Sequence, residues 1–281
     1  MTNAAAVSRE SVRPDEAPCH NDAVSRLRTI RVTRYVTPLR EGGSLPAIVE
    51  ADDDGLYVLK FRGAGQGARA LIAELLSGEI ARALGLLVPE LVFAELDREL
   101  SRTEPDPEIH ALIQDSAGLN LALDYLPGSV MYDPVVQQTA ADLASRIVWF
   151  DAYVTNVDRT ARNTNMLMWH KQLWLIDHGA SLYFHHTPGW ESGGRATAPF
   201  PLIKEHVLLR QAATLAEVDP ACAAMLNQDR LREIVDIVPD SWLTERDPGA
   251  DPGRIREAYA RYLSQRLETP RAFVEEAIRV R

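Results

Sequence analysis

The chain has 281 residues, of which 46% are hydrophobic and 25% are charged, and this length suits one large domain or two modest lobes around a cleft. The formal net charge of −10 argues against a general nucleic-acid binder, which normally carries a basic face. The two cysteines, Cys19 and Cys222, are too few for a disulfide framework or a zinc knuckle, so we expect free thiols. No run of about 18 apolar residues predicts a membrane span, and no apolar segment near the first residue suggests a secretory signal. We therefore expect a cytoplasmic protein.

The first part of the chain, up to about residue 128, is rich in predicted strands. Residues 1–28 are polar and aperiodic and predict a flexible leader. Strands are predicted at 30–36, 46–51, 56–61, 90–96, 109–114 and 121–126, with a turn at 52–55. A helix is predicted at 67–85, because apolar residues recur at every fourth position from Ile72 to Leu84. Gly85 stands where the glycine that ends a helix belongs.

From Pro134 onward the pattern becomes mostly helical. A long helix is predicted for 134–156, then a hairpin at 165–177 and a glycine- and proline-rich loop at 188–201. Further helices are predicted at 219–238, 253–266 and 269–280. The fold class is therefore α+β, with a β-rich lobe at 29–128 that holds one helix, and a mostly helical lobe at 129–281. Residues 126–129 are the predicted connection between the lobes.

Asp158 and Asn163 are separated by four residues, in the form D-x-x-x-x-N. This is the spacing of the catalytic loop in phosphoryl-transfer kinases, where a carboxylate accepts the proton of the attacking hydroxyl and an amide oxygen binds Mg²⁺. Taken alone, the spacing is a weak signal and favours a capped turn, because Asp and Asn are common loop residues.

The hairpin that follows strengthens the catalytic interpretation. Its strands turn around His170 and Lys171, so residue 164 is predicted to lie opposite Asp177. Asn163 and Asp177 would then lie side by side and share a Mg²⁺ ion, which prefers hard oxygen ligands. Gly179 completes a D-x-G sequence and is expected to let the backbone turn away from the metal.

Lys60 is one of only three lysines among 30 basic residues. Alternation along 56–61 places it on the same strand face as Leu56 and Val58. A lysine in that setting suits a cleft in which it holds nucleotide phosphates, and the alternative is a strand-end lysine that extends to solvent. The helical wheel favours Glu79 over Glu74 as the buried carboxylate partner of Lys60. A residue that faces a cleft need not lie on the apolar stripe, however, so the choice stays open at this point.

The phosphate-binding loop is less sharply defined. No G-x-x-x-x-G-K-[ST] sequence is present, which excludes a P-loop. Gly42, Gly43 and Ser44 lie between two predicted strands ahead of Lys60, and the glycine-rich segment 62–69 is a second candidate.

Three polar residues surround the D-x-x-x-x-N motif. Arg159 either holds acidic groups of the loop, binds a phosphorylated segment or lies on the surface, whereas Asp151 and Asn156 are expected to brace the loop. The spacing of the histidines matches no zinc site.

With Lys60, "NVDRTARN" at 156–163 and "IDHG" at 176–179, the chain resembles the short branch of the HipA-like kinases, over roughly residues 30–240. The resemblance implies a two-lobed protein-kinase-like fold and an ATP- and Mg²⁺-dependent kinase that phosphorylates Ser or Thr of a protein. It implies Asp158, Lys60 and Arg159 as catalytic residues and Asn163 and Asp177 as metal ligands. The residues that it implies for nucleotide binding are Lys60, Glu74, Gly42, Gly43, Ser44, Asp124, Tyr125 and Leu126.

One residue departs from the pattern of the larger members, which have D-R-H where this chain has D-R-T, with Thr160. The alternatives to a protein kinase are a catalytically silent module that binds a nucleotide or a partner, and a kinase of small molecules or lipids. Direct nucleic-acid binding and membrane association are not expected. The acceptor, the oligomeric state and the role of the loop at 188–201 stay open.

Overall fold

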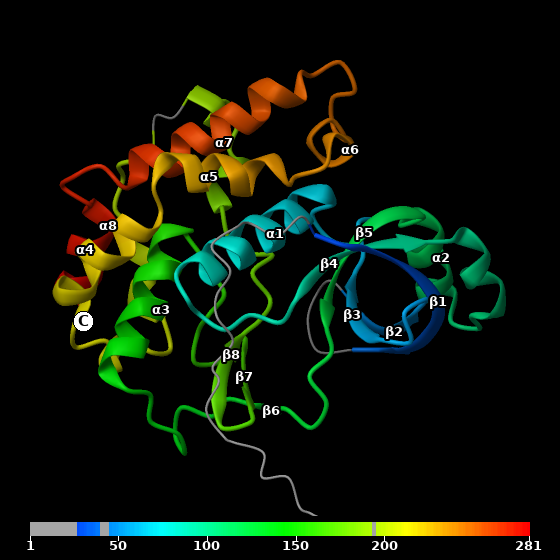
Figure 1. The fold of residues 1–281 in the computed structure, drawn as a ribbon, viewed down its shortest axis with the longest axis horizontal. Coiled ribbons are helices and arrows are strands. Elements are labelled where there is room, and N and C mark those ends of the chain that lie inside the picture. Colours follow the sequence, from blue (N-terminus) through cyan, green and yellow to red (C-terminus); the bar gives the residue numbers. More distant parts are fainter. Residues whose placement is uncertain (1–26, 40–44, 193–194) are drawn as a thin grey trace, which may run out of the picture.

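The computed structural model describes residues 27–39, 45–192 and 195–281. The protein is α+β, as predicted. Five strands close into a barrel in the order β1-β2-β3-β5-β4, which Figure 1 shows on one side of the molecule. They are β1 (Thr29–Pro38), β2 (Ala47–Ala51), β3 (Leu56–Lys60), β4 (Leu91–Leu96) and β5 (Gly118–Asp124). Neighbouring strands pair antiparallel except β1 and β4, whose parallel pairing closes the barrel. Closure leaves no free sheet edge in this part of the protein.

Helix α1 (Ala68–Ala83) connects the barrel to the rest of the molecule. Most of its residues are buried, because it runs between the barrel and helices α5 and α7 in Figure 1. Its end follows the predicted pattern: Gly85 has a φ of 69°, its N–H donates to Arg82 O at 2.9 Å, and the Leu86 N–H donates to Ala81 O at 3.0 Å. These two bonds form a Schellman motif.

The predicted strand at 109–114 is wrong, because this segment forms helix α2 (Pro107–Asp115). Asp106 caps its first turn by accepting the Glu108 N–H, and proline is favoured at the first helical position. Ile109 and Ile113 then fall on one helix face and are buried against the barrel core. The described residues of the segment 29–128 therefore form two α-helices, α1 and α2, and not one, and a 3₁₀ turn (Arg98–Thr103) precedes α2.

A three-stranded sheet follows, made of β6 (Val130–Met131), β7 (Met166–Trp169) and β8 (Gln172–Leu175). Between β6 and β7 lies helix α3 (Ala141–Tyr153), which is shorter than the predicted helix at 134–156. Its early start is prevented by a turn at Asp133, whose carboxylate accepts the Val135 N–H at 2.8 Å. The Tyr132 hydroxyl also donates to Gln137 O at 3.0 Å and holds this segment outside the helix.

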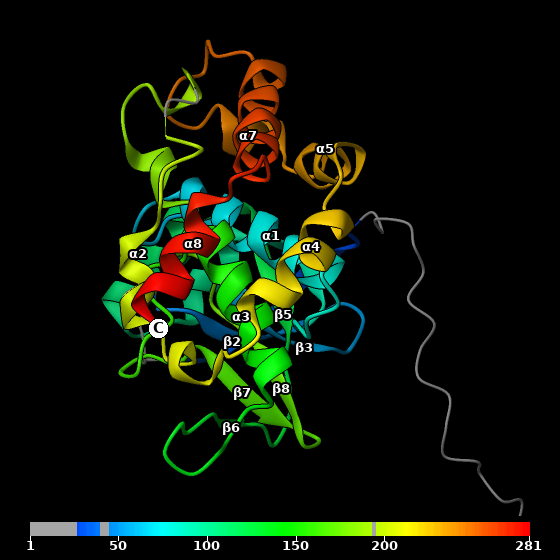
Figure 2. The same ribbon diagram turned by 90° about the vertical axis from the view of Figure 1, so that its left-hand side faces the viewer.

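The remaining chain is mostly helical. Its α-helices are α4 (Leu215–Met225), α5 (Gln228–Asp236), α6 (Asp240–Leu243), α7 (Pro252–Arg266) and α8 (Ala272–Val280). Short 3₁₀ turns occur at η2 (Tyr183–His186), η3 (Trp190–Ser192), η4 (Pro201–Glu205) and η5 (Leu209–Gln211). The single helix predicted at 219–238 is divided because Asn227 caps α5 through the Arg230 N–H. Figures 1 and 2 agree that α3, α4 and α8 pack together. Among the described residues, none of the helices has the length and apolar character of a membrane span.

Two cores hold these parts together. The barrel encloses its own cluster of buried side chains, including Val49, Leu59 and Val92. A larger cluster joins α1 to α3, the hairpin and the C-terminal helices. The apolar side chains of α1 therefore pack mainly with the helical part, although α1 precedes β4 and β5 in the sequence.

Candidate active site

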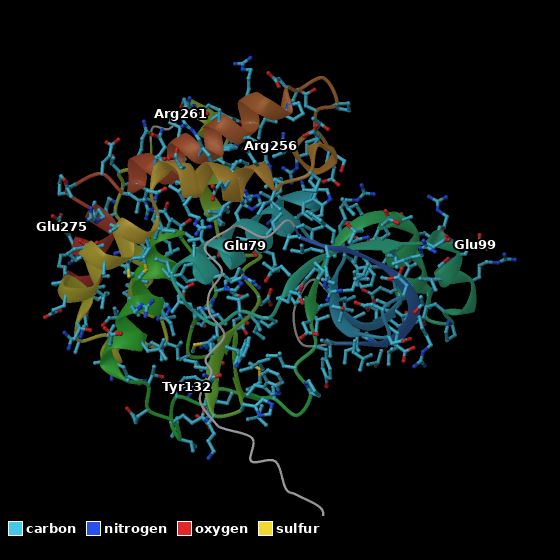
Figure 3. The ribbon with its side chains drawn as sticks, viewed as in Figure 1. Glu79, Glu99, Tyr132, Arg256, Arg261 and Glu275 are labelled. Atoms are coloured by element: carbon cyan, nitrogen blue, oxygen red, sulfur yellow. The ribbon has the colours of Figure 1, made fainter. Side chains whose placement is uncertain are left out.

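Lys60, at the end of β3, contacts two acidic residues from different parts of the chain. Its Nζ donates to Asp177 Oδ1 at 2.6 Å and lies 3.6 Å from Glu74 Oε2 on α1. Only 11% of the Lys60 side chain is exposed, so the strand-end lysine that extends to solvent is the wrong alternative. Glu79, labelled in Figure 3, lies farther along α1 and pairs with Arg82 at 3.6 Å. The structure thus selects Glu74 as the partner of Lys60.

The charges of this group stabilise one another. Burial alone would raise the pKa of Glu74, but the Lys60 ammonium and the bonds from His178 outweigh it and lower the pKa to about 2. Burial likewise opposes the charge on Lys60, yet Glu74 and Asp177 raise the pKa of its ammonium above the usual range. Lys60 and Glu74 are therefore both ionised at neutral pH.

The D-H-G segment at 177–179 is attached to α1 through His178. The His178 N–H donates to Glu74 Oε2 at 2.9 Å, and its Nδ1 lies 3.3 Å from Glu74 Oε1. The ring is completely buried and meets Phe150 of α3 edge to face at 5.7 Å. Glu74 therefore bonds to both the lysine of the barrel and the segment that carries Asp177.

The expected role of Gly179 is wrong. A Cβ on Gly179 would stand 3.7 Å from both Ala70 O and Glu74 Oε2, an ordinary contact distance, so no steric reason demands glycine here. The sharp turn is instead made by Asp177, whose φ is 56°. Asp tolerates this left-handed conformation better than most residues.

The hairpin register agrees with the prediction. Met166 pairs with Leu175 and Trp169 pairs with Gln172, around a turn in which His170 and Lys171 both have positive φ. Beyond the strands, the Ile176 N–H donates to Asn165 O at 3.0 Å. The next pair in this register is Thr164 opposite Asp177, which brings Asn163 to the end of the hairpin that carries Asp177.

Asp158 accepts bonds from the two asparagines of its loop. Asn163 Nδ2 donates to Asp158 Oδ2 at 2.7 Å, and Asn165 Nδ2 donates to the same oxygen at 3.3 Å. The pKa of Asp158 is raised, chiefly by burial and also by the charge of Asp177, while the asparagine bonds oppose the rise. This effect of Asp177 indicates that Asp158 and Asp177 share one electrostatic environment.

Behind the loop, Asp151 of α3 is a fully buried anchor. It accepts bonds from Arg159 Nε at 2.6 Å, from His206 Nε2 at 2.8 Å and from Asn156 Nδ2 at 2.8 Å. Burial alone would raise its pKa, but Arg159 and His206 outweigh that effect and lower the pKa well below the usual range. The N–H of Leu208 donates to His206 Nδ1 at 3.0 Å, so Nδ1 acts as an acceptor and Nε2 is the ring nitrogen that donates to Asp151.

Arg159 lies inside the protein, because only 1% of it is exposed. Of the alternatives for Arg159, a surface position is therefore wrong, and the side chain instead holds an acidic group, Asp151. Besides Asp151, its guanidinium donates to the carbonyl of Asn165 and to Ile176 O, the latter at 3.4 Å. It joins α3 to the two strands of the hairpin at the end where Asp177 lies.

Gly42, Gly43 and Ser44 lie outside the described residues. In the second candidate loop, 62–69, several backbone N–H groups already have acceptors within the protein. The Gly63 N–H donates to Ser116 Oγ at 3.0 Å, and the Ala68 N–H donates to Glu245 Oε2 at 2.8 Å. At the start of α1, the Glu245 carboxylate therefore takes the Ala68 N–H that a phosphate would otherwise accept.

The predicted adenine-contacting residues end β5 and begin the connection to β6. The Asp124 N–H donates to Glu90 O at 2.9 Å and the Tyr125 N–H donates to Leu56 O at 3.0 Å. Of the three, only Leu126 has an N–H with no backbone acceptor among the described residues.

Three residues of the site, His178, Asn165 and His206, were not predicted from the sequence. His178 stands inside D-x-G, and Asn165 is two residues beyond Asn163, so both lie within or next to a predicted motif. His206 lies 55 residues from Asp151, and no local pattern connects the two.

Residues 32–272 match the family model described as HipA-like kinase. The chain belongs to the HipA-like kinase family. The match extends beyond the 30–240 expected from the motifs and reaches into α8. Family membership identifies the protein as a kinase-type phosphotransferase. No curated protein matches the chain significantly.

Two solved kinases are similar in structure to this HipA-like kinase. A Helicobacter pylori proinflammatory kinase, CtkA, has 12% identity and a TM-score of 0.48, covering 90% of this chain and 98% of its own. The Golgi casein kinase with Mn/ADP bound has 12% identity and a TM-score of 0.45, covering 88% of this chain and 74% of its own. The likeness is distant, and the family assignment rests on the sequence match.

Proposed function

We propose that this HipA-like kinase transfers the γ-phosphoryl group of ATP, in the presence of Mg²⁺, to a Ser or Thr hydroxyl of a protein. The observation that carries the proposal is the contact of Lys60 with Glu74 and Asp177. Three segments far apart in the sequence, β3, α1 and the D-H-G segment, meet there. Charged side chains with no common function would not need to be brought together from three segments. The barrel and the helical part would act as the two lobes of a kinase, with the site between them.

The donor atoms near the hairpin suit Mg²⁺. Asn163 uses its amide nitrogen for Asp158, and Asp177 uses Oδ1 for Lys60. Among the described residues, the Asn163 amide oxygen and Asp177 Oδ2 have no hydrogen-bond partner, and both are the hard oxygens that Mg²⁺ prefers. Bound Mg²⁺ would supply neutralisation of negative charge on the phosphates.

Each residue of the site would have a separate task. Lys60, held by Glu74, would bind and orient the nucleotide phosphates. Asp158 would orient the acceptor hydroxyl and take its proton, and its raised pKa makes it a better proton acceptor than an ordinary aspartate. Leu126 would offer its N–H to the adenine. Arg159, through its bond to Asp151, would keep the loop and its general base Asp158 in position. Arg159 is therefore assigned a positioning role.

The test is phosphate transfer from labelled ATP with Mg²⁺ in variants of the two acidic residues. Asp158→Asn should lower the transfer rate by about 10²- to 10⁴-fold, the usual contribution of a general base. Asp177→Ala should abolish transfer. Asp115→Asn, an exposed acidic residue at the end of α2, is the matched control and should behave as the wild type.

Thermal unfolding of every variant checks that the fold is kept. Wild-type transfer in either Asp158→Asn or Asp177→Ala would contradict the proposal. Stabilisation by ATP and Mg²⁺ without any transfer in the wild type would instead indicate a binding module. Mass spectrometry after incubation with ATP would show which hydroxyl, if any, becomes phosphorylated.

A further inference from the structure

The chain passes from β5 of the barrel to β6 through a tight turn, which lies between these two labels in Figure 1. The Ser129 N–H donates to Leu126 O at 3.2 Å, so residues 126–129 close a β-turn. Pro127 is its second residue, and Gly128, with a φ of 75°, is its third. A proline, whose φ is negative, followed by a glycine with positive φ defines a type II turn. We call residues 126–129 the connecting turn.

One side chain of the hairpin is bonded to the connecting turn. Trp169, the last residue of β7, donates from Nε1 to Pro127 O at 2.9 Å. In a type II turn the central peptide is flipped relative to the commoner type I turn, which reverses the direction of the Pro127 carbonyl. An indole N–H can only donate, so a carbonyl is the kind of partner that it needs. The bond therefore depends on the backbone conformation that Gly128 permits.

The ring of Trp169 is itself held in the hairpin. It meets the ring of Trp174 on β8 edge to face, with centroids 5.4 Å apart. The other strand of this sheet, β6, follows the connecting turn directly and pairs with β7, with Val130 opposite Met168. Strand pairing thus fixes the chain just after the connecting turn, and Trp169 fixes the turn itself.

The connecting turn begins at Leu126, whose N–H has no hydrogen-bond acceptor within the described part of the chain. Just before it, the Tyr125 N–H donates to Leu56 O of the barrel at 3.0 Å. The Leu126 side chain is buried but belongs to neither of the two core clusters. The direction of the Leu126 N–H is therefore set by the barrel on one side and by the connecting turn on the other.

We propose that Trp169 is a positioning residue for the adenine nucleotide. It holds the connecting turn in the type II conformation and thereby keeps the Leu126 N–H directed at the adenine. The inference rests on the proposed function, which supplies the contact between Leu126 and the adenine. Trp169 acts through the turn and touches neither the transferred phosphoryl group nor the acceptor, so it affects nucleotide binding and not the transfer step.

The first experiment titrates ADP with Mg²⁺ into the full chain by calorimetry and measures steady-state rates with ATP. Trp169→Phe keeps an aromatic ring and removes the donor. The Kd for ADP and the KM for ATP should both rise about threefold to tenfold, as expected for the loss of one hydrogen bond, while kcat stays unchanged. Trp174→Phe is the matched control. Its Nε1 is buried without a partner among the described residues, so the same change removes no bond and should leave both constants unchanged.

Three results would overturn the proposal and leave the proposed transfer reaction standing. They are wild-type constants in Trp169→Phe, even with a lowered thermal midpoint, an equal rise in Trp174→Phe, and a fall in kcat at an unchanged KM. Wild-type protein that binds no ADP would instead contradict the proposed function, and this inference with it.

A second measurement changes the turn and leaves the tryptophan in place. A Cβ on Gly128 would meet no atom within 4 Å, so Gly128→Ala acts only through the backbone preference against positive φ. It should also raise the Kd for ADP. Adding Trp169→Phe to it should have little further effect, because the Pro127 carbonyl has already left the indole. Gly118→Ala, at the opposite end of β5, has a φ of 102° and equally open space, and should leave the Kd unchanged. Additive effects of Gly128→Ala and Trp169→Phe would show that the two residues act separately and would overturn the proposal.

Discussion

At the scale of single residues, the site depends on a choice between two glutamates of one helix. Glu74 and Glu79 are both buried, but they differ in what surrounds them. The carboxylate of Glu74 meets Lys60 and His178, and its pKa is lowered. Burial raises the pKa of Glu79, and the charge of Arg82 only partly opposes the rise. The same residue type therefore has opposite electrostatic behaviour five positions apart.

This contrast provides a matched pair of variants. Glu74→Gln removes the charge that holds Lys60, so we expect phosphate transfer to fall about tenfold to a hundredfold, the equivalent of one charge-assisted bond. Glu79→Gln removes a charge that burial already disfavours, and activity should be unchanged. Steady-state rates with ATP measure both effects. An equal loss in both variants would mean that Glu74 has no special role.

At the scale of elements, the loop that carries Asp158 is held from behind by α3. Asp151 accepts bonds from Asn156 and Arg159, which belong to the loop itself, and from His206, which directly follows η4. The Val207 N–H also donates to Arg159 O at 3.2 Å. The position of Asp158 thus depends on one buried carboxylate that does not itself face the site.

Asp151→Asn should therefore destabilise the protein by about 3–5 kcal/mol at pH 7, because it leaves a buried arginine without its counter-charge. The folded-state pKa of Asp151 lies below its unfolded value of about 3.9, so its stabilisation is complete above that pH and is lost as the pH falls below it. Urea unfolding from pH 7 to pH 3 should show the difference between wild type and variant shrink only near the acidic end. A constant difference over this range would argue against an ionised Asp151 in the folded protein.

At the scale of the whole molecule, Arg266 of α7 connects three regions through backbone carbonyls. Its guanidinium donates to Ala152 O at 2.8 Å and to Tyr153 O at 2.7 Å on α3, and to Ala196 O at 2.9 Å and Ala198 O at 3.1 Å. Trp190 and Phe200 are buried in the same part of the chain. Trp190, Ala196 and Phe200 thus hold the loop predicted at 188–201 against the helical core, whereas most of its other described residues are exposed.

Arg266→Met should destabilise the protein by about 3 kcal/mol or more, because several buried carbonyls lose a charged donor together. The thermal midpoint measures the loss. Arg232→Met makes the same substitution on the exposed face of α5 and should change the thermal midpoint little. A midpoint that stays at the wild-type value in Arg266→Met would mean that water replaces the guanidinium without cost.

Much of the site could be predicted from the sequence because its residues are close together in the chain. The spacing of Asp158 and Asn163, the symmetry of the hairpin about His170 and Lys171, and the alternation up to Lys60 are local patterns. Backbone geometry translates such patterns directly into neighbouring side chains. The strand predicted at 109–114 failed for a local reason, since Asp106 and Pro107 begin a helix before a segment whose apolar residues were taken for a strand.

What only the tertiary structure decided concerns contacts between residues that are distant in the chain. The sequence could not choose between Glu74 and Glu79, because the choice depends on which face of α1 meets β3 and the D-H-G segment. It assigned the turn to Gly179, although packing against α1 lets Asp177 take the left-handed conformation. It offered no connection between Asp151 and His206 or between the hairpin and the connecting turn. The sequence by itself determined the local motifs and the family they belong to, while long-range packing, which no local pattern encodes, determined the partner of each charged group.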